Sequence, residues 1–208
     1  TNETILLQAQ AGIESTRGTA VAATRKVYAQ IEPSYSRALM DFQDTSGTWF
    51  GRRRAAYGRE KISFSASDVA TYEDAAWWLK MAVDGTVTGS ADAGTPIAYT
   101  YQFTPSPTAD NLKAMTLEFG ESGNQYESDQ VMVNSLTLRM DSDNDSEPTW
   151  MIEADLMGRT WVDSTFTAAL SDRATEPILA RGTKLYIDAS GGTMGTPQVT
   201  GKLISASY

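Results

Sequence analysis

The sequence predicts a mainly β fold, a β-sandwich or partly rolled barrel with one flanking α-helix, an extended N-terminal arm and an extended loop. Alternation of apolar and polar residues recurs in most segments after Gly85, which is typical of half-buried strands. Helical spacing occurs in one segment alone, from about Asp68 to Asp84. The 208 residues suffice for a single well-buried domain, which we assign to residues 25–208, with an arm over residues 1–24.

The first third of the chain predicts two strands, a loop and a third strand. Residues Thr1–Thr24 are small and polar and lack an apolar stripe, so we expect an extended arm. Pro33 should end the first strand, because proline cannot donate a hydrogen bond to a sheet. The predicted elements, in order, are strands Lys26–Ile31 and Ser36–Phe42, the loop Gln43–Arg59 and strand Arg59–Ser65.

The helix predicted over about Asp68–Asp84 has an apolar stripe and a stop signal at Gly85. Trp77 and Trp78 are consecutive, so about 100° of rotation separates them on a helix. Both cannot face one narrow core stripe, and we expect one of them to meet a second surface. The residues at helical spacing are Tyr72, Ala75, Ala76, Leu79 and Val83.

The remainder is predicted to be nearly all β. A central hairpin should place Ile152, Ala154 and Leu156 inward and the acids between them outward, because side chains alternate along a strand. The predicted strands are Ile97–Thr104, Lys113–Phe119, the hairpin Val131–Asp141 with Thr149–Trp161, and then Lys184–Asp188 and Lys202–Tyr208.

Composition argues against several classes of function. The chain has no cysteine and no histidine, which removes thiolate nucleophiles, disulfides, the commonest metal ligand and the usual general base near neutral pH. We therefore expect neither an enzyme nor a cofactor. The sequence also lacks a run of about 18 apolar residues, so no membrane-spanning helix is expected.

Negative charge is concentrated in one part of the chain. The net charge is −9, and Ala114–Gly158 has ten acidic residues and a single base, Arg139. Such a surface repels nucleic acid.

Within the acidic segment, Asp141–Pro148 resembles the opening of a calcium loop, but Ser146 stands where the turn needs glycine. We favour an acidic hairpin tip, because Asp, Asn and Ser are good turn residues.

A second charged segment, Gly51–Lys61, has five bases and one acid. Arginines beside aromatic residues suit nucleic acid, but the net charge opposes it, and both residue types are also enriched at protein interfaces. We favour a protein–protein interface, with an ordinary solvated loop as the alternative. The interface candidates here are Trp49, Arg52, Arg53, Arg54 and Tyr57.

Glu153 and Asp155 lie two residues apart on one predicted strand, so their side chains share a face about 7 Å apart. That spacing overlaps the separation of the two carboxylates in inverting glycosidases. Exposed strands often have such pairs, and repetition of this pair around a ring would line a channel with negative charge. We favour this electrostatic use over catalysis.

The stretch Gly12–Tyr28 contains the pattern Gly-x-Glu-x-x-x-Gly-Thr-Ala-x-Ala and leads into a strand. It resembles the entry segment of the tail tube proteins of long-tailed bacteriophages. The segment Ile62–Gly85, which ends in Trp-Trp-Leu-Lys-Met-Ala-Val-Asp-Gly, and the β-rich remainder resemble the same family. The carboxyl end departs from the family pattern, because it stops where members often continue.

The resemblance implies a structural virion protein that self-assembles into hexameric rings, which stack into the hollow tail tube through which DNA passes. It implies assembly in the host cytoplasm and partnership with a tape measure protein, a tail terminator and distal tail proteins, without specific DNA binding, a cofactor or a membrane. The arm Thr1–Thr24 and the loop Gln43–Arg59 would hold ring to ring. Arg17, Trp77 and Trp78 would join the interface, and Glu153 with Asp155 would face the lumen.

The alternative from another class is a carbohydrate-binding or adhesion β-sandwich. Exposed aromatic rings would then bind the ligand, and the candidates are Trp49, Trp150 and Trp161. A glycoside hydrolase that uses Glu153 and Asp155 is the third hypothesis.

Overall fold

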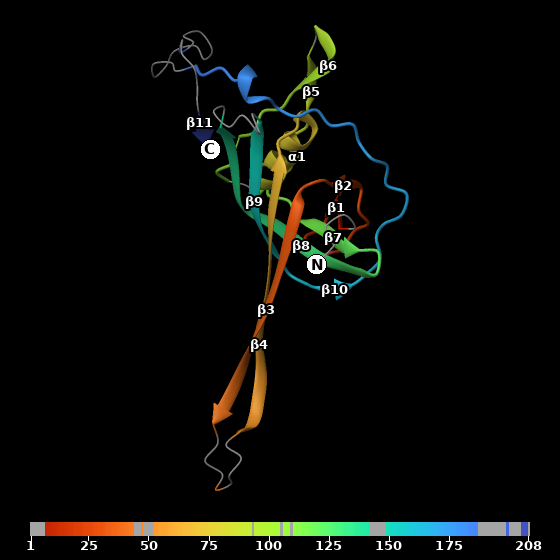
Figure 1. The fold of residues 1–208 in the computed structure, drawn as a ribbon, viewed down its shortest axis with the longest axis vertical. Helices are drawn as coiled ribbons and strands as arrows, with labels where there is room; N and C mark the ends of the chain where they lie inside the picture. The colour runs from red at the N-terminus through yellow and green to blue at the C-terminus, as the bar shows by residue number, and fades with distance from the viewer. Residues whose placement is uncertain are drawn as a thin grey trace.

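The computed structural model describes residues 7–43, 47, 52–92, 94–104, 106–108, 110–141, 149–186, 199 and 205–207. Its described strands form one antiparallel sheet of nine strands and a separate two-stranded sheet, with a single α-helix (Figure 1). The predicted class, mainly β with one flanking helix, is confirmed.

The described elements belong mostly to the large sheet. Seven strands of the large sheet are ordered β2-β1-β7-β8-β9-β4-β3, and β10 and β11 also pair with β8. The bounds are β1 (Gln8–Ile13), β2 (Arg25–Val27), β3 (Gln30–Gln43), β4 (Arg52–Val69), α1 (Tyr72–Ala82), β5 (Ser90–Asp92), β6 (Thr95–Thr100), β7 (Met115–Glu121), β8 (Asn124–Asp141), β9 (Trp150–Gly158), β10 (Val162–Asp163), a 3-10 turn (Ala180–Gly182) and β11 (Ser205–Ser207).

The large sheet folds over on itself along β8. The first half of β8 pairs with β7 and the second half with β9, with register shifts in both ladders. The two halves of the sheet face each other, since Phe64 of β4 meets Phe119 of β7 at a centroid distance of 5.1 Å although these strands are not neighbours. The end strands β2 and β3 do not pair with each other in the described structure, so the roll is not a closed barrel.

The hairpin β3–β4 is much longer than the sequence predicted. Residues Gln30–Gln43 form one continuous strand through Pro33, and β4 begins at Arg52, so residues 43 and 52–59 of the predicted loop Gln43–Arg59 are strand, while residues 44–46 and 48–51 lie outside the described residues. Proline is tolerated because β3 is the edge strand and needs no donor on its outer side. Pairing of β4 with β9 stops at Ile62, and beyond this point the hairpin projects alone from the body (Figure 1).

The helix is shorter than predicted and buries a different face. It begins after Thr71, whose side chain accepts a hydrogen bond from the Asp74 backbone N–H, and it spans Tyr72–Ala82. Trp77 and Trp78 are 7% and 2% exposed, so the expectation that one of them meets a second surface outside the chain is wrong. The chain itself supplies that second surface, because the Arg25 guanidinium lies 4.6 Å from the centre of a Trp77 ring.

The predicted arm is also corrected in its described part. Strand β1 pairs with β2 on one side and β7 on the other, and Ala9 and Ala11 belong to the core. Residues 8–13 are therefore an internal strand of the sheet. Residues 1–6 lie outside the described residues.

The central hairpin was predicted well. Strands β8 and β9 pair as expected, and Ile152, Ala154 and Leu156 are buried. Of the last two predicted strands, Lys202–Tyr208 contains β11, and Lys184–Asp188 lies partly outside the described residues.

Candidate functional site

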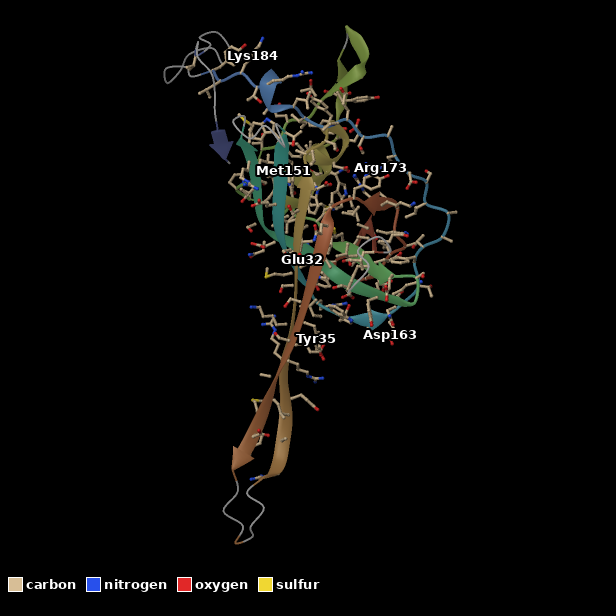
Figure 2. The ribbon with its side chains drawn as sticks, in the orientation of Figure 1. Glu32, Tyr35, Met151, Asp163, Arg173 and Lys184 are labelled. Atoms are coloured by element: carbon tan, nitrogen blue, oxygen red, sulfur yellow. The ribbon has the colours of Figure 1, made fainter. Side chains whose placement is uncertain are left out.

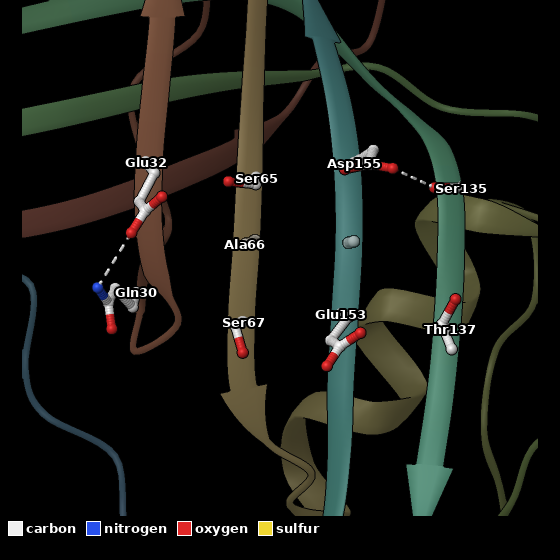
Figure 3. Close-up of a pocket in the computed structure, with 10 residues that line it drawn as sticks. Gln30, Glu32, Ser65, Ala66, Ser67, Ser135, Thr137, Glu153 and Asp155 are labelled. Carbon is white, nitrogen blue, oxygen red and sulfur yellow. Dashed lines mark hydrogen bonds between the residues drawn. The ribbon is translucent and has the colours of Figure 1, made fainter. Parts of the chain in front are cut away.

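The sheet formed by β3, β4, β9 and β8 presents a face of hydroxyls and carboxylates (Figure 3). The strand register aligns its side chains in two rows across the four strands. The rows are Glu32, Ser65, Asp155 and Ser135, and then Gln30, Ser67, Glu153 and Thr137.

These rows, which we call the acidic face, surround a shallow trough of about 360 Å³. The floor is formed by the small side chains of β4 between Glu32 on one wall and the two acids of β9 on the other. The Ser135 hydroxyl donates to Asp155 at 2.8 Å, and Arg139 donates to Glu153 at 2.8 Å. In Figure 3 the helix lies behind the sheet, so the acidic face is turned away from α1.

The structure brings Glu153 and Asp155 onto one outward face as predicted, and it adds Glu32, which the sequence analysis missed. Glu32 was assigned to a strand end beside Pro33, and only the continuation of β3 past the proline brings it level with Asp155. The trough has no aromatic lining residue. A sugar-cleaving site normally offers an aromatic or apolar wall, so the arrangement gives the hydrolase hypothesis no support.

A second candidate surface is the distal ribbon, which we define as Arg37–Gln43 with Arg52–Lys61. No described side chain in it is buried. Leu39, Met40 and Phe42 are each nearly half exposed, and Tyr57 is 67% exposed. An isolated two-stranded hairpin is only marginally stable in water, and exposed apolar patches are typical of interaction surfaces, so the ribbon is a candidate interface.

The ribbon is apolar on both faces. Leu39 pairs with Tyr57, and the next pair, Met40 with Ala56, lies on the opposite face. The Arg37 guanidinium lies 4.7 Å from the centre of the Tyr57 ring and forms an ion pair with Glu60. Both faces can therefore contact a neighbour.

The predicted interface residues lie in different places. Arg54 and Tyr57 lie in the distal ribbon, Arg52 and Arg53 also belong to β4 but only their backbone is described, and Trp49 lies outside the described residues. Trp77 and Trp78 are in the core and present no ring surface to a partner. Arg17 is half-exposed and paired within the chain.

Arg17 holds the residues before β7. Its guanidinium donates to both carboxylate oxygens of Asp110 and to the backbone oxygen of Leu112. The hydrogen bond from Arg17 lowers the pKa of Asp110 below its ordinary value. Arg17 thus has an intrachain role that the sequence did not indicate.

The pattern that carried the family resemblance forms a buried polar anchor. The Glu14 side chain is 2% exposed and accepts hydrogen bonds from the backbone N–H of Gly18 at 2.6 Å and of Gln130 at 2.7 Å. It also accepts from the Thr116 hydroxyl at 3.1 Å. Gln130 has a positive φ of 48°, which points to a backbone conformation held by its contacts. The Glu of the pattern therefore fastens the turn after β1 to β7 and β8.

Both glycines of the pattern are favoured by the structure, Gly12 by lack of space and Gly18 by its backbone conformation. A Cβ at Gly12 would lie 2.4 Å from the backbone oxygen of Ala22. Gly18 has a φ of +76°, and a Cβ there would lie 2.7 Å from the Arg159 guanidinium. The same guanidinium donates to the Gly18 backbone oxygen at 2.6 Å. Small residues at these positions allow two chain segments to approach closely.

Arg159 also binds Asp129 beneath this turn. Burial opposes ionisation of Asp129, but hydrogen bonds from Arg159 and Thr160 outweigh it and keep the pKa of Asp129 below its ordinary value. The carboxylate is thus charged throughout the neutral range and completes the anchor.

The tryptophans proposed for sugar binding are packed within the chain. Trp150 donates its ring N–H to the Thr183 hydroxyl at 2.9 Å. Trp161 lies 4.8 Å from the Phe119 ring and 5.9 Å from the Tyr35 ring, measured between centroids. Tyr35 lies where the long hairpin leaves the body (Figure 2). These contacts explain the two rings as packing, and Trp49 lies outside the described residues.

Two other kinds of site are not found in the described part of the chain. No group of three acidic side chains there could hold a metal ion, and the Asp141–Asp145 segment lies outside it from residue 142 onward. The described helix is too short and too polar to cross a membrane.

Comparison with known proteins identifies no relative, so the candidate sites depend on the geometry described above. No protein-family model matches the chain, and no curated protein matches its sequence.

Proposed function

We propose that this chain is the structural subunit of a hollow tube, a self-assembling protein like the tail tube proteins that its N-terminal pattern resembles. The observation that carries the proposal is a sheet whose outward face is acidic and hydroxylated and which, over the described residues, is unpaired along the outer side of β3 and along residues 132–138 of β8. Such a sheet suits the wall of a channel that a polyanion crosses without binding.

Free strand edges support ring formation. Over the described residues β3 pairs with β4 alone, and β8 between Met132 and Leu138 pairs with β9 alone. A long exposed edge is a template for pairing with another chain. Edge-to-edge pairing of copies, six in the arrangement that the resemblance implies, would close a large barrel and remove every such edge.

The acidic face would then line the lumen. Carboxylates repel DNA phosphates, and serine and threonine offer no apolar surface on which a translocating chain could stick. We propose that DNA passes through this lumen, that a tape measure protein occupies it beforehand, and that a tail terminator and distal tail proteins contact the two ends of the tube.

The distal ribbon would be the element that holds ring to ring. It extends far from the body, no third described strand pairs with it, and it has apolar side chains on both faces. Arginine in such a ribbon suits a protein interface, because it pairs with carboxylates and packs on aromatic rings.

Microscopy of the purified protein at rising concentration tests the assembly. We expect rings and tubes with a central channel. A protein that stays monomeric at every concentration would contradict the proposal.

Labelling of an introduced thiol tests which face lines the channel. Because the chain has no cysteine, Thr137→Cys on the acidic face gives a single reactive thiol. We expect a bulky maleimide polymer to label it in monomers and not in tubes, whereas a small maleimide labels both. Tyr72→Cys, at an exposed position of α1, is the matched control and should react in both states. Equal labelling of Thr137→Cys by the polymer in tubes and monomers would remove the acidic face from the lumen.

A further inference from the structure

A groove opens where the rolled sheet fails to close, between β1 and β7 on one side and the start of β3 on the other. Its volume is about 820 Å³, more than twice that of the acidic trough. Apolar side chains from both walls line it, including Leu7, Val27, Tyr28, Ile31, Phe119 and Phe166. Contiguous apolar surface of this kind is typical of interaction sites and ligand-binding grooves.

The distal ribbon has apolar side chains that suit this groove, but within one chain it points away from it. The distal ribbon exposes Leu39, Met40 and Phe42, and it runs away from the body (Figure 1). Its apolar side chains lie on both faces, so it is suited to insertion between two walls. A groove with two walls offers that arrangement, whereas a flat surface would leave one face of the ribbon in water.

The distal ribbon and the surroundings of the groove also have opposite charges. The distal ribbon contains six bases, namely Arg37, Arg52, Arg53, Arg54, Arg59 and Lys61, against two acids, Asp41 and Glu60. Beside the groove, Glu121 lies between the lining residues Gly120 and Ser122, and Glu127 follows the lining residue Gln125 by two positions. Asp163 of β10 lies against the same stretch of β8 (Figure 2). The lining base Lys26 is ion-paired with Asp172 at 2.7 Å, so its charge is compensated.

We propose that this groove receives the distal ribbon of a second copy of the chain. The proposal rests on the proposed function and names the surface that the ring-to-ring element would contact. A ribbon that binds a different surface of its neighbour makes a head-to-tail contact, which repeats as an open polymer when its rotation does not close into a ring. Stacking of this kind extends along one axis, as a tube requires.

Cross-linking in the cysteine-free chain tests the contact directly. Phe42→Cys in the ribbon is mixed with Leu7→Cys in the groove under assembling conditions, and a short bismaleimide joins thiols that lie close together. The control mixes Phe42→Cys with Tyr99→Cys, since Tyr99 is an exposed aromatic residue of β6 at the end of the molecule opposite the ribbon. We expect the Leu7 pair to form at least tenfold more heterodimer than the Tyr99 pair, with the linked peptides identified by mass spectrometry.

The outcomes separate this inference from the proposed function. Tubes that form while Phe42→Cys links to Tyr99→Cys, or to neither partner, would overturn the groove contact and leave the tube standing. A specific Leu7 link in a protein that makes only short head-to-tail oligomers would support the groove and contradict the tube. Absence of both assembly and cross-link would overturn both. Because Leu7, Phe42 and Tyr99 are all exposed, unchanged circular dichroism should show that the variants fold.

Discussion

The turn after β1, residues 14–24, is small and polar yet anchored to the body, whereas the distal ribbon has large apolar side chains and no buried side chain in its described part. In the first region Glu14 is 2% exposed, and in the second Tyr57 is 67% exposed. The usual relation between polarity and burial is reversed at these two residues.

The difference shows that burial follows from the partners that a fold provides. Glu14 receives three hydrogen bonds, two of them from backbone N–H groups that would otherwise need water. The ribbon emerges beyond the last residue of β4 that pairs with β9, so no third strand of the described residues pairs with it. A buried polar residue with partners marks structure, and an exposed apolar residue without them marks an interface.

The largest expected effect on stability comes from breaking the anchor. Glu14→Ala would leave the donors of Gly18, Thr116 and Gln130 buried without an acceptor, at a cost of about 3 kcal/mol. Urea unfolding measures the loss. Ser15→Ala, at the exposed neighbouring position, is the control and should change stability by less than about 0.5 kcal/mol. Equal effects of the two substitutions would show that Glu14 is no anchor.

Gly12→Ala should have the next largest effect. The new methyl group would meet the backbone oxygen of Ala22, and neither segment can move freely because β1 lies within the sheet. We expect a loss of about 2 kcal/mol in the same unfolding experiment. Gly123→Ala is the matched control, because a Cβ there meets no atom within 4 Å, and a similar loss in both variants would contradict the steric explanation.

Asp129→Asn should cost less, about 1 kcal/mol at neutral pH, because Arg159 is half exposed and its ion pair is weakened by solvent. The pKa of Asp129 is lower in the folded than in the unfolded protein, so its charge stabilises the fold above the unfolded pKa of about 3.9. That contribution falls as the pH decreases through the folded pKa. The stability difference between wild type and variant should therefore shrink below about pH 4, and a difference independent of pH would argue against a role for the charge.

The smallest effect on stability is expected in the ribbon, where the effect on assembly should be the largest. The double substitution Leu39→Ser and Phe42→Ser changes side chains that are each nearly half exposed and lie outside the core, so the free energy of unfolding should change by less than about 1 kcal/mol. Sedimentation should nevertheless show loss of polymers. Charge reversal of Arg52, Arg53 and Arg54 should have the same result, and polymerisation that survives both variants would exclude the ribbon from the interface.

Periodicity predicted the elements that depend on local pattern. The alternation around Ile152 identified β9 and the outward position of Glu153 and Asp155, since a strand with one buried face must alternate. The prediction that Pro33 ends the first strand was wrong. A proline stops a central strand but not an edge strand, and only the sheet order shows that β3 is at the edge. Periodicity failed for Trp77 and Trp78 as well, because a wide buried helix face needs covering from segments that are distant in sequence, such as Arg25.

The sequence by itself determined the strand-rich class, the single helix, the acidic central hairpin and the absence of cysteine and histidine chemistry, because each follows from residue type and local order. Only the tertiary structure decided that Glu14 is buried, that Glu32 joins Asp155 on one face and that the distal ribbon stands alone. These three facts depend on strand pairing between residues far apart in the chain. No local pattern encodes which strands will meet, and the resulting contacts decide whether the same side chain is an anchor or an interface.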